Sequence, residues 1–119
     1  MGLNKPVDFT TAKLLKEKGI NIWSEYRYTD FNGVERLEKE ASEIFPYAPT
    51  IAEVVMWLYE KHGIWIDVSL NQFSKPKDLQ WMYSIVFTKD CTYSHSPKSY
   101  ASPTEAYEAA ILYTLNNLI

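Results

Sequence analysis

The sequence predicts an α+β protein in which an antiparallel sheet of three to four strands carries helices mainly on one face. Three segments show the apolar spacing and the terminal residues of helices, and two others alternate strictly between apolar and polar residues. About eight residues join the two alternating segments, too few for the crossover that parallel strands require. The expected order is helix, strand, an optional second strand, helix, strand, strand, helix.

The first helix is expected over residues 9–18. Phe9, Ala12 and Leu15 recur at helical spacing, and charged residues lie between them. Gly19 follows at the position where a left-handed residue commonly ends a helix.

The region after this helix begins with a strand and then has two interpretations. Residues 20–29 are rich in β-branched and aromatic residues, and the Asp-Phe-Asn-Gly sequence of residues 30–33 is typical of a hairpin turn. Residues 34–37 then form a short returning strand, which is the favoured interpretation. A weak helix over residues 35–45 is the alternative, because Leu37, Ala41 and Ile44 are spaced by four and by three.

The second helix has the clearest signals in the chain. Thr50 and Glu53 form a capping box, in which each side chain accepts a hydrogen bond from an amide that the helix leaves unpaired. Helical spacing then continues up to Gly63 through Ile51, Val54, Val55, Leu58 and His62. His62 is therefore expected to be partly buried.

Two strands are predicted over residues 64–70 and 79–89, joined by a turn at residues 71–78. One face of this pair carries Ile64, Ile66, Val68 and Leu70 with Trp81, Tyr83, Ile85 and Phe87. The opposite face carries Trp65, Asp67 and Ser69 with Gln80, Met82, Ser84, Val86 and Thr88.

The last helix follows a polar segment, residues 90–102, which is expected to be a mobile loop. Ser102, Pro103 and Glu105 combine a capping residue, a proline at the first helical position and a glutamate at the third. The apolar stripe is expected from Tyr107, Ile111, Leu115 and Leu118, with Ala106, Ala109 and Ala110 to the side and behind.

The composition is that of one soluble globular domain over residues 1–119. Hydrophobic residues make up 46% of the chain and charged residues 23%, and Cys91, the only cysteine, leaves no intrachain disulfide. No segment has the apolar length of a signal peptide or a membrane span, so we expect a cytoplasmic protein without a membrane partner. The net charge of −3 disfavours nucleic-acid binding.

Motifs of the common enzyme classes are absent from the sequence. The four glycines stand apart, so there is no phosphate-binding loop, and HExxH, CxxC and GxSxG are all missing. His62 and His95, the two histidines, lie on different predicted elements, which disfavours a metal site. We therefore expect no catalytic residue, no metal, no cofactor and no enzymatic activity.

The aromatic residues supply the one candidate binding surface. Trp65 points away from the predicted core beside Met82 and Val86, and Trp23 in the first strand is a candidate to join them. Trp57 lies off the apolar stripe of the second helix and is expected to be partly exposed. The open alternative is that the first helix or a second copy of the chain covers this sheet face.

Three stretches resemble a family of uncharacterised small proteins encoded by phages, prophages and mobile elements of anaerobic gut bacteria. They are residues 11–19, residues 48–50 with 57–58 and 60–64, and residues 105–110. The charged segment 34–45 and the serine-rich segment 90–102 do not match the family. The resemblance implies a cytoplasmic accessory protein of a mobile element and assigns no activity to any residue.

The leading hypothesis is a non-enzymatic module that binds a protein partner or itself through the aromatic sheet face. The alternative is single-stranded nucleic-acid binding by the same aromatics, which the acidic balance disfavours. Two strands followed by a final helix also resemble small antitoxin-like and double-stranded-RNA-binding folds, which is an analogy of fold alone. A small-molecule enzyme is the third hypothesis.

Overall fold

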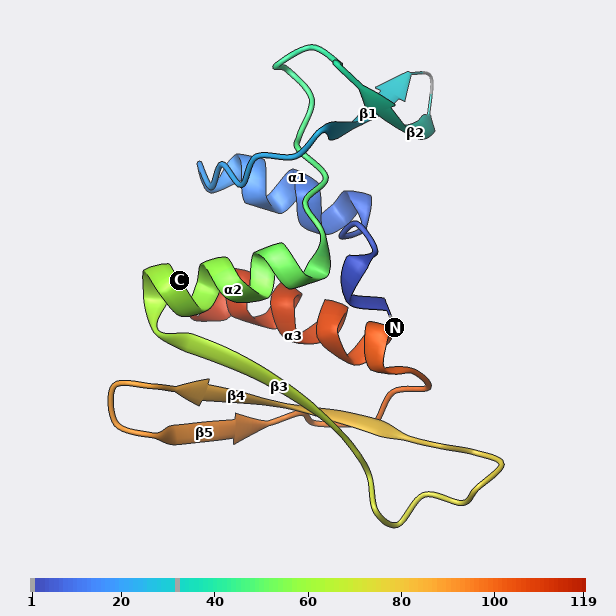
Figure 1. Ribbon diagram of the computed structural model, residues 1–119, viewed down its shortest axis with the longest axis vertical. Helices are drawn as coiled ribbons and strands as arrows, with labels where there is room; N and C mark the ends of the chain where they lie inside the picture. Colours follow the sequence, from blue (N-terminus) through green and yellow to red (C-terminus); the bar gives the residue numbers. More distant parts are fainter. Residues whose placement is uncertain (1, 32) are drawn as a thin grey trace.

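The structure, a computed structural model, describes residues 2–31 and 33–119 and has the α+β class that the sequence predicts. Figure 1 shows its elements in space. In chain order they are η1 (Gly2–Asn4), α1 (Phe9–Glu17), β1 (Tyr26–Phe31), β2 (Val34–Lys39), α2 (Ile51–His62), β3 (Ile64–Leu70), β4 (Trp81–Phe87), β5 (Thr92–His95) and α3 (Pro103–Asn117).

The strands are divided between two antiparallel sheets. β1 and β2 form a two-stranded sheet at one end of the molecule, and β3, β4 and β5 form a three-stranded sheet at the other end (Figure 1). The free edge of β1 is occupied by a later segment, because the Tyr28 N–H donates to the Pro46 carbonyl at 3.0 Å and the Ala48 N–H donates to the Tyr26 carbonyl at 3.0 Å. The first strand therefore belongs to a separate hairpin and not to the main sheet.

The hairpin interpretation of residues 34–45 is confirmed. β1 and β2 pair in register from Tyr26 opposite Lys39 to Phe31 opposite Val34. Gly33 has a φ of 78°, the left-handed conformation that a tight hairpin turn requires, while the predicted turn residue Asn32 lies outside the described residues. Every residue of β2 is exposed, which explains why the strand has no apolar alternation in the sequence.

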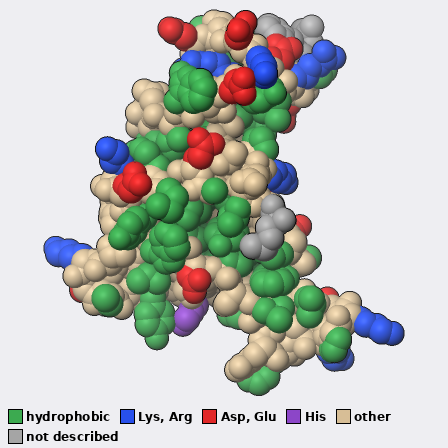
Figure 2. All heavy atoms as spheres, viewed as in Figure 1, with side chains coloured by type: hydrophobic (Ala, Val, Ile, Leu, Met, Phe, Trp, Pro, Cys, Tyr) green, Lys and Arg blue, Asp and Glu red, His purple; other side chains and the backbone are tan. Residues whose placement is uncertain are grey.

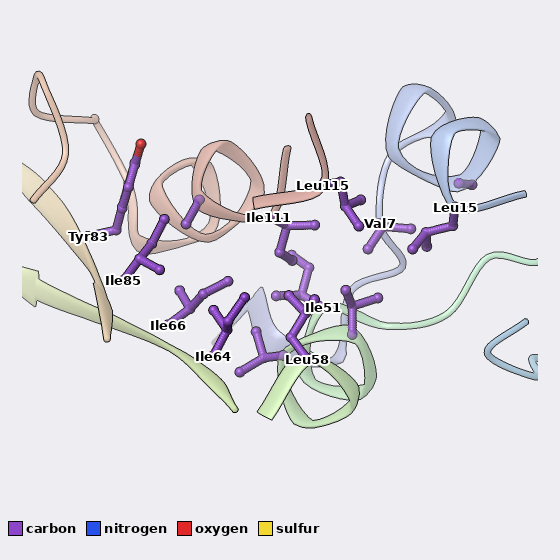
Figure 3. Packing of buried hydrophobic residues seen from close by; sticks show 14 residues of the cluster. Val7, Leu15, Ile51, Leu58, Ile64, Ile66, Tyr83, Ile85, Ile111 and Leu115 are labelled. Atoms are coloured by element: carbon purple, nitrogen blue, oxygen red, sulfur yellow. The ribbon is translucent and has the colours of Figure 1, made fainter. Parts of the chain in front are cut away.

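The core lies between the three-stranded sheet and the helices packed on one of its faces. Figure 3 shows Ile66 and Ile85 of the sheet pointing toward Leu58 of α2 and Ile111 of α3. All four side chains are fully buried or nearly so. α1 packs against α3 and not against the sheet, and it extends the same cluster (Figure 1). The expectation that helices cover mainly one face is confirmed.

α2 begins and ends as predicted from its terminal residues. The Thr50 N–H donates to Glu53 Oε1 at 3.0 Å, and the Glu53 N–H donates to Thr50 Oγ1 at 3.2 Å, which completes the capping box. Gly63 follows the helix with a φ of 63° and turns the chain directly into β3. This tight connection fixes the position of α2 over the sheet.

The buried stripe of α3 differs from the prediction. Ala106 and Ala110 are fully buried, whereas Tyr107 is half-buried. Thr114 is also buried, which is possible because its hydroxyl donates to the Ala110 carbonyl at 2.8 Å. Ile111 and Leu115 of the predicted stripe are fully buried, so the prediction is confirmed for these two residues, and the buried face is displaced from Tyr107 toward the smaller side chains.

The segment 90–102 contains a strand where the sequence predicts a mobile loop. β5 pairs with β4 from Thr92 opposite Phe87 to His95 opposite Ser84. All four β5 residues are exposed, so no alternation of apolar and polar residues marks the strand in the sequence. The predicted strand at residues 79–89 is also shorter in the structure, where it spans Trp81–Phe87.

Candidate interaction surface

The face of the three-stranded sheet opposite to the helices is the candidate interaction surface. Side chains alternate between the two faces of a strand, so every second residue of β3, β4 and β5 lies on this face and outside the core. We call this set the open face, and it consists of Trp65, Asp67, Ser69, Met82, Ser84, Val86, Tyr93 and His95. In the described part of the chain, the helices lie on the other side of the sheet (Figure 1).

One row of the open face is apolar and aromatic. Trp65 lies opposite Val86, and Val86 lies opposite Tyr93, so the three side chains cross the whole sheet. Trp65 is 38% exposed and Tyr93 is 63% exposed. Tyr59 of α2 holds the Trp65 ring in an edge-on contact, with 5.6 Å between the ring centroids. The Trp65 ring is thus already oriented, which lowers the entropy lost when a partner binds.

The neighbouring row is polar. Asp67 lies opposite Ser84, and Ser84 lies opposite His95, with 3.0 Å between Ser84 Oγ and His95 Nδ1. Ser84 stands between the carboxylate and the imidazole, so the carboxylate does not orient the imidazole as it does in a nucleophile–base–acid relay. The row offers hydrogen-bonding groups beside the aromatic row and not an activated nucleophile.

The open face carries little formal charge. Asp67 is its only acidic residue, and it has no lysine or arginine. Burial, with a smaller contribution from the Asp67 carboxylate, raises the pKa of Tyr107 in α3. Figure 2, which views the molecule from one side, shows hydrophobic side chains gathered where α2 and the three-stranded sheet lie, and charged side chains crowding the hairpin end.

Three of the five predicted surface residues lie together. Trp65, Met82 and Val86 share the open face, although Ser84 separates Met82 from the apolar row along β4. Trp23 does not join them, because it lies in the segment between α1 and β1, and that segment leads to the hairpin at the other end of the molecule from the three-stranded sheet (Figure 1). Trp57 does not join them either; it belongs to α2, where it is half-buried against the core.

His62 is exposed and not partly buried as predicted. It is the last residue of α2, and its ring lies against the Trp57 ring at 5.2 Å between centroids. The helical spacing places His62 on the apolar stripe, but the stripe has left the core by this last turn.

Sequence reasoning missed two aromatic residues, namely Tyr93 on the open face and Tyr59, which contacts Trp65 from α2. Tyr93 was missed because β5 was not predicted. The Asp-x-Thr sequence at residues 90–92 could have indicated the turn before this strand, since Asp90 Oδ1 accepts a hydrogen bond from the Thr92 hydroxyl at 2.7 Å. Tyr59 lies on the solvent side of α2, where helical spacing alone gives no reason to connect it with Trp65. A third aromatic residue, Phe73, is 85% exposed in the loop between β3 and β4.

A groove with a volume of about 430 Å³ lies between the start of α1 and the start of α3. Its three carboxylates already have partners within the fold. Asp8 accepts from the Thr11 N–H at 2.8 Å, Glu105 accepts from the Ala101 N–H at 3.1 Å, and Glu108 pairs with Lys5 at 3.2 Å. The groove is therefore built by helix capping and an ion pair.

Within residues 2–31 and 33–119, no three His, Cys, Asp or Glu side chains lie close enough to hold a metal ion. No helix in the same residues is long and apolar enough to cross a bilayer. Comparison of the chain with protein-family models, with curated proteins and with solved structures finds no match.

Proposed function

We propose that this protein is a non-enzymatic interaction module that binds a protein partner, or a second copy of itself, through the open face. The observation that carries the proposal is the row formed by Trp65, Val86 and Tyr93 on a sheet face that no described helix covers. The first helix, the alternative cover for this face, packs on α3 instead.

The chemistry of the open face is that of a protein interface. Tryptophan, tyrosine and methionine are enriched in protein interfaces, whereas lysine, glutamate, aspartate and serine are depleted there. The open face has depleted types at Asp67, Ser69 and Ser84. Trp65, Tyr93 and Met82 match the enriched types, and the face carries a single formal charge. Tryptophan and tyrosine are also the residues whose removal most often costs 2 kcal/mol or more of binding free energy.

The test is the variant Trp65→Asp, which places a charge at one end of the row formed by Trp65, Val86 and Tyr93. We expect association, measured by native mass spectrometry of gently purified protein, to weaken by at least about 30-fold, because an aromatic hot-spot residue contributes roughly 2 kcal/mol or more. Thermal unfolding checks that the fold persists, since Trp65 also contacts Tyr59.

The matched control is Trp23→Asp. Trp23 is 69% exposed and lies away from the open face, so the same substitution there should leave association unchanged. Equal association of Trp65→Asp and the unsubstituted protein contradicts the proposal.

Single-stranded nucleic acid is the second candidate ligand. Its support is that Trp65 and Tyr93 present exposed rings on one antiparallel sheet, where bases could stack. The lack of lysine and arginine on the open face counts against it. Affinity for an oligonucleotide that falls steeply as salt rises favours this candidate over a protein partner.

The biological setting in this proposal is the one implied by the family resemblance, that of a cytoplasmic accessory protein of a mobile element. Detection of a co-purifying protein encoded by the same element would support it.

A further inference from the structure

β5 is exposed on both faces and along its outer edge. All four of its residues are exposed, and among the described elements its close packing is with β4. The helices that cover β3 and β4 do not reach it (Figure 1). A strand in this position presents unpaired main-chain groups to solvent.

The hydrogen bonds of β4 identify which groups these are. The Ser96 N–H donates to the Tyr83 carbonyl at 2.9 Å. Because hydrogen-bonded positions alternate along an antiparallel strand, the even-numbered residues of β5 direct their N–H and carbonyl groups toward β4. Tyr93 and His95 must then turn their N–H and carbonyl groups outward. No described residue forms a main-chain hydrogen bond with either of them.

The other free edges are less open than that of β5. On the outer edge of β3, Ile64 is 3% exposed and Ile66 is 1% exposed, so the first half of that edge is closed, whereas Leu70 at its end is exposed. Four of the six residues of β2 are charged, which discourages pairing with another strand. β5, with the sequence Thr-Tyr-Ser-His, contains no lysine, no acidic residue and no proline.

We infer that β5 pairs antiparallel with β5 of a second copy of this chain, which makes one six-stranded sheet from the two copies. The inference goes beyond the proposed function, because this pairing uses the outer edge of β5 and leaves the open face of each copy exposed. In the two-fold register that we assign, Ser94 lies opposite Ser94 of the second copy, and Tyr93 lies opposite His95 of the second copy.

This register uses all four outward groups of each strand. Shifting the two-fold axis to His95 places Tyr93 opposite Pro97, which has no N–H to donate. Shifting it to Tyr93 places His95 opposite Cys91, whose φ of 58° takes it out of the extended conformation. Ser94 is therefore the centre that the chain favours.

The accessible surface of the whole molecule is larger than that of a compact monomer of the same mass. The accessible surface is 7589 Å² for a chain of 13.9 kDa. A compact monomer of this mass exposes about 6,700 Å², so the excess is about 900 Å². A standard interface removes about 800 Å² from each partner. Pairing at β5 would also place the two open faces side by side on one sheet.

The first experiment tests the register by disulfide formation in the full chain. In Cys91→Ser/Ser94→Cys, the two introduced cysteines would face each other in a non-hydrogen-bonded pair with about 4.5 Å between Cα atoms, within the range of a disulfide. We expect mild oxidation to give a covalent dimer on a non-reducing gel.

The matched control is Cys91→Ser/Thr92→Cys. In the assigned register, Thr92 lies opposite residue 96 of the second copy, so the two cysteines would be about 13 Å apart along the strand. The unsubstituted protein is a second control, because its exposed Cys91 lies still farther from the axis. No crosslink at position 94, or equal crosslinking at positions 92 and 94, overturns the inference.

The second experiment separates the main chain from the side chain. His95→Pro removes an outward N–H that β4 does not use, and an edge strand tolerates proline there. His95→Ala removes the same side chain and keeps the N–H. We expect a larger loss of dimer in native mass spectra for His95→Pro, and equal losses overturn the inference.

The two proposals can fail separately. A crosslink at Ser94→Cys that persists in Trp65→Asp supports pairing at β5 and contradicts a role for the open face in that association. Loss of association in Trp65→Asp without a crosslink at Ser94→Cys supports the open face and overturns pairing at β5.

Discussion

Gly63 is the residue on which the connection between α2 and β3 depends. Its φ of 63° is one that residues with a Cβ adopt at a cost of about 1–2 kcal/mol, and a Cβ there would lie 2.9 Å from Thr88 Oγ1. The Thr88 hydroxyl also donates to the Gly63 carbonyl at 2.9 Å, so it is not free to move away.

We predict that Gly63→Ala lowers the free energy of unfolding by about 2 kcal/mol or more. Gly19→Ala is the control, because Gly19 has a similar φ of 71° and its Cβ would meet nothing within 4 Å. Chemical denaturation of the two variants measures the difference. Equal losses in the free energy of unfolding would show that the contact between the added Cβ of residue 63 and Thr88 does not destabilise the fold.

Asp90 fixes the turn that leads into β5. Its carboxylate accepts hydrogen bonds from the Thr92 hydroxyl and the Thr92 N–H, which lower the pKa of Asp90 below its ordinary value. The ionised form is thus the one that stabilises the turn. This stabilisation is complete above the pKa of an unfolded aspartate, about 3.9, and is lost as the pH falls through the lower pKa of the folded protein.

The measurement for Asp90 is an NMR titration of the Thr92 amide. We expect the chemical shift of the Thr92 amide to change with pH, with a midpoint below the pKa of an ordinary aspartate. In Asp90→Asn this pH-dependent change should be absent. A midpoint at or above the ordinary value contradicts the hydrogen bonds that define this turn.

Helix ends and strand faces were predictable from individual residues. Thr50 with Glu53, and Ser102 with Glu105, satisfy amides that every helix leaves unpaired, so local sequence alone determines them. The position of Trp65 on the open face follows from strand alternation. The place of Trp23 was predicted wrongly, because the β-branched and aromatic residues at 20–25 favour a strand that begins only at Tyr26 in the structure.

Among the elements, a buried apolar face gave the clearest predictions, and β2, which buries no residue, was predicted only from the turn sequence before it. α2 and β3 carry periodic patterns because one side of each meets the core. β5 has no buried residue to mark it. The separation of the β1–β2 hairpin from the main sheet depends on the pairing of residues 46–48 with β1, which no local pattern in the sequence indicates.

The hairpin should be the least stable element of the protein. β2 buries no residue, and a two-stranded hairpin has little stability of its own. β1 is tied to the body by the Tyr28 hydroxyl, which donates to the Val7 carbonyl at 2.6 Å, and by Arg27, which donates to the Phe45 carbonyl at 2.6 Å. β2 has contacts mainly with β1.

We predict that amides of β2 exchange with solvent by local opening, whereas amides of β4 exchange only on global unfolding. Native-state hydrogen exchange at increasing denaturant measures both. Ile85, at the centre of the core, provides the reference. Protection of β2 amides equal to that of Ile85 would contradict a locally opening hairpin.

Across the whole molecule, charge and shape are distributed unevenly. The principal dimensions are 45 × 37 × 20 Å, and the radius of gyration of 15.1 Å exceeds the roughly 13.5 Å of a compact chain of this length. Six acidic and three basic residues lie within residues 25–43, so the hairpin region accounts for the full net charge of −3. The remainder, including the three-stranded sheet, is neutral. Association through this sheet therefore meets little net repulsion.

The position of α3 in the chain has a consequence for biosynthesis. α3 packs against η1, α1, α2, β3 and β4, and the ribosome makes all of them before it makes α3. Its residues Ala110, Ile111 and Leu115 are fully buried, so the core cannot close until they have been translated. Until then, only α2 covers the core face of the main sheet, and a chain interrupted before Pro103 would expose the rest of that face to chaperones and proteases.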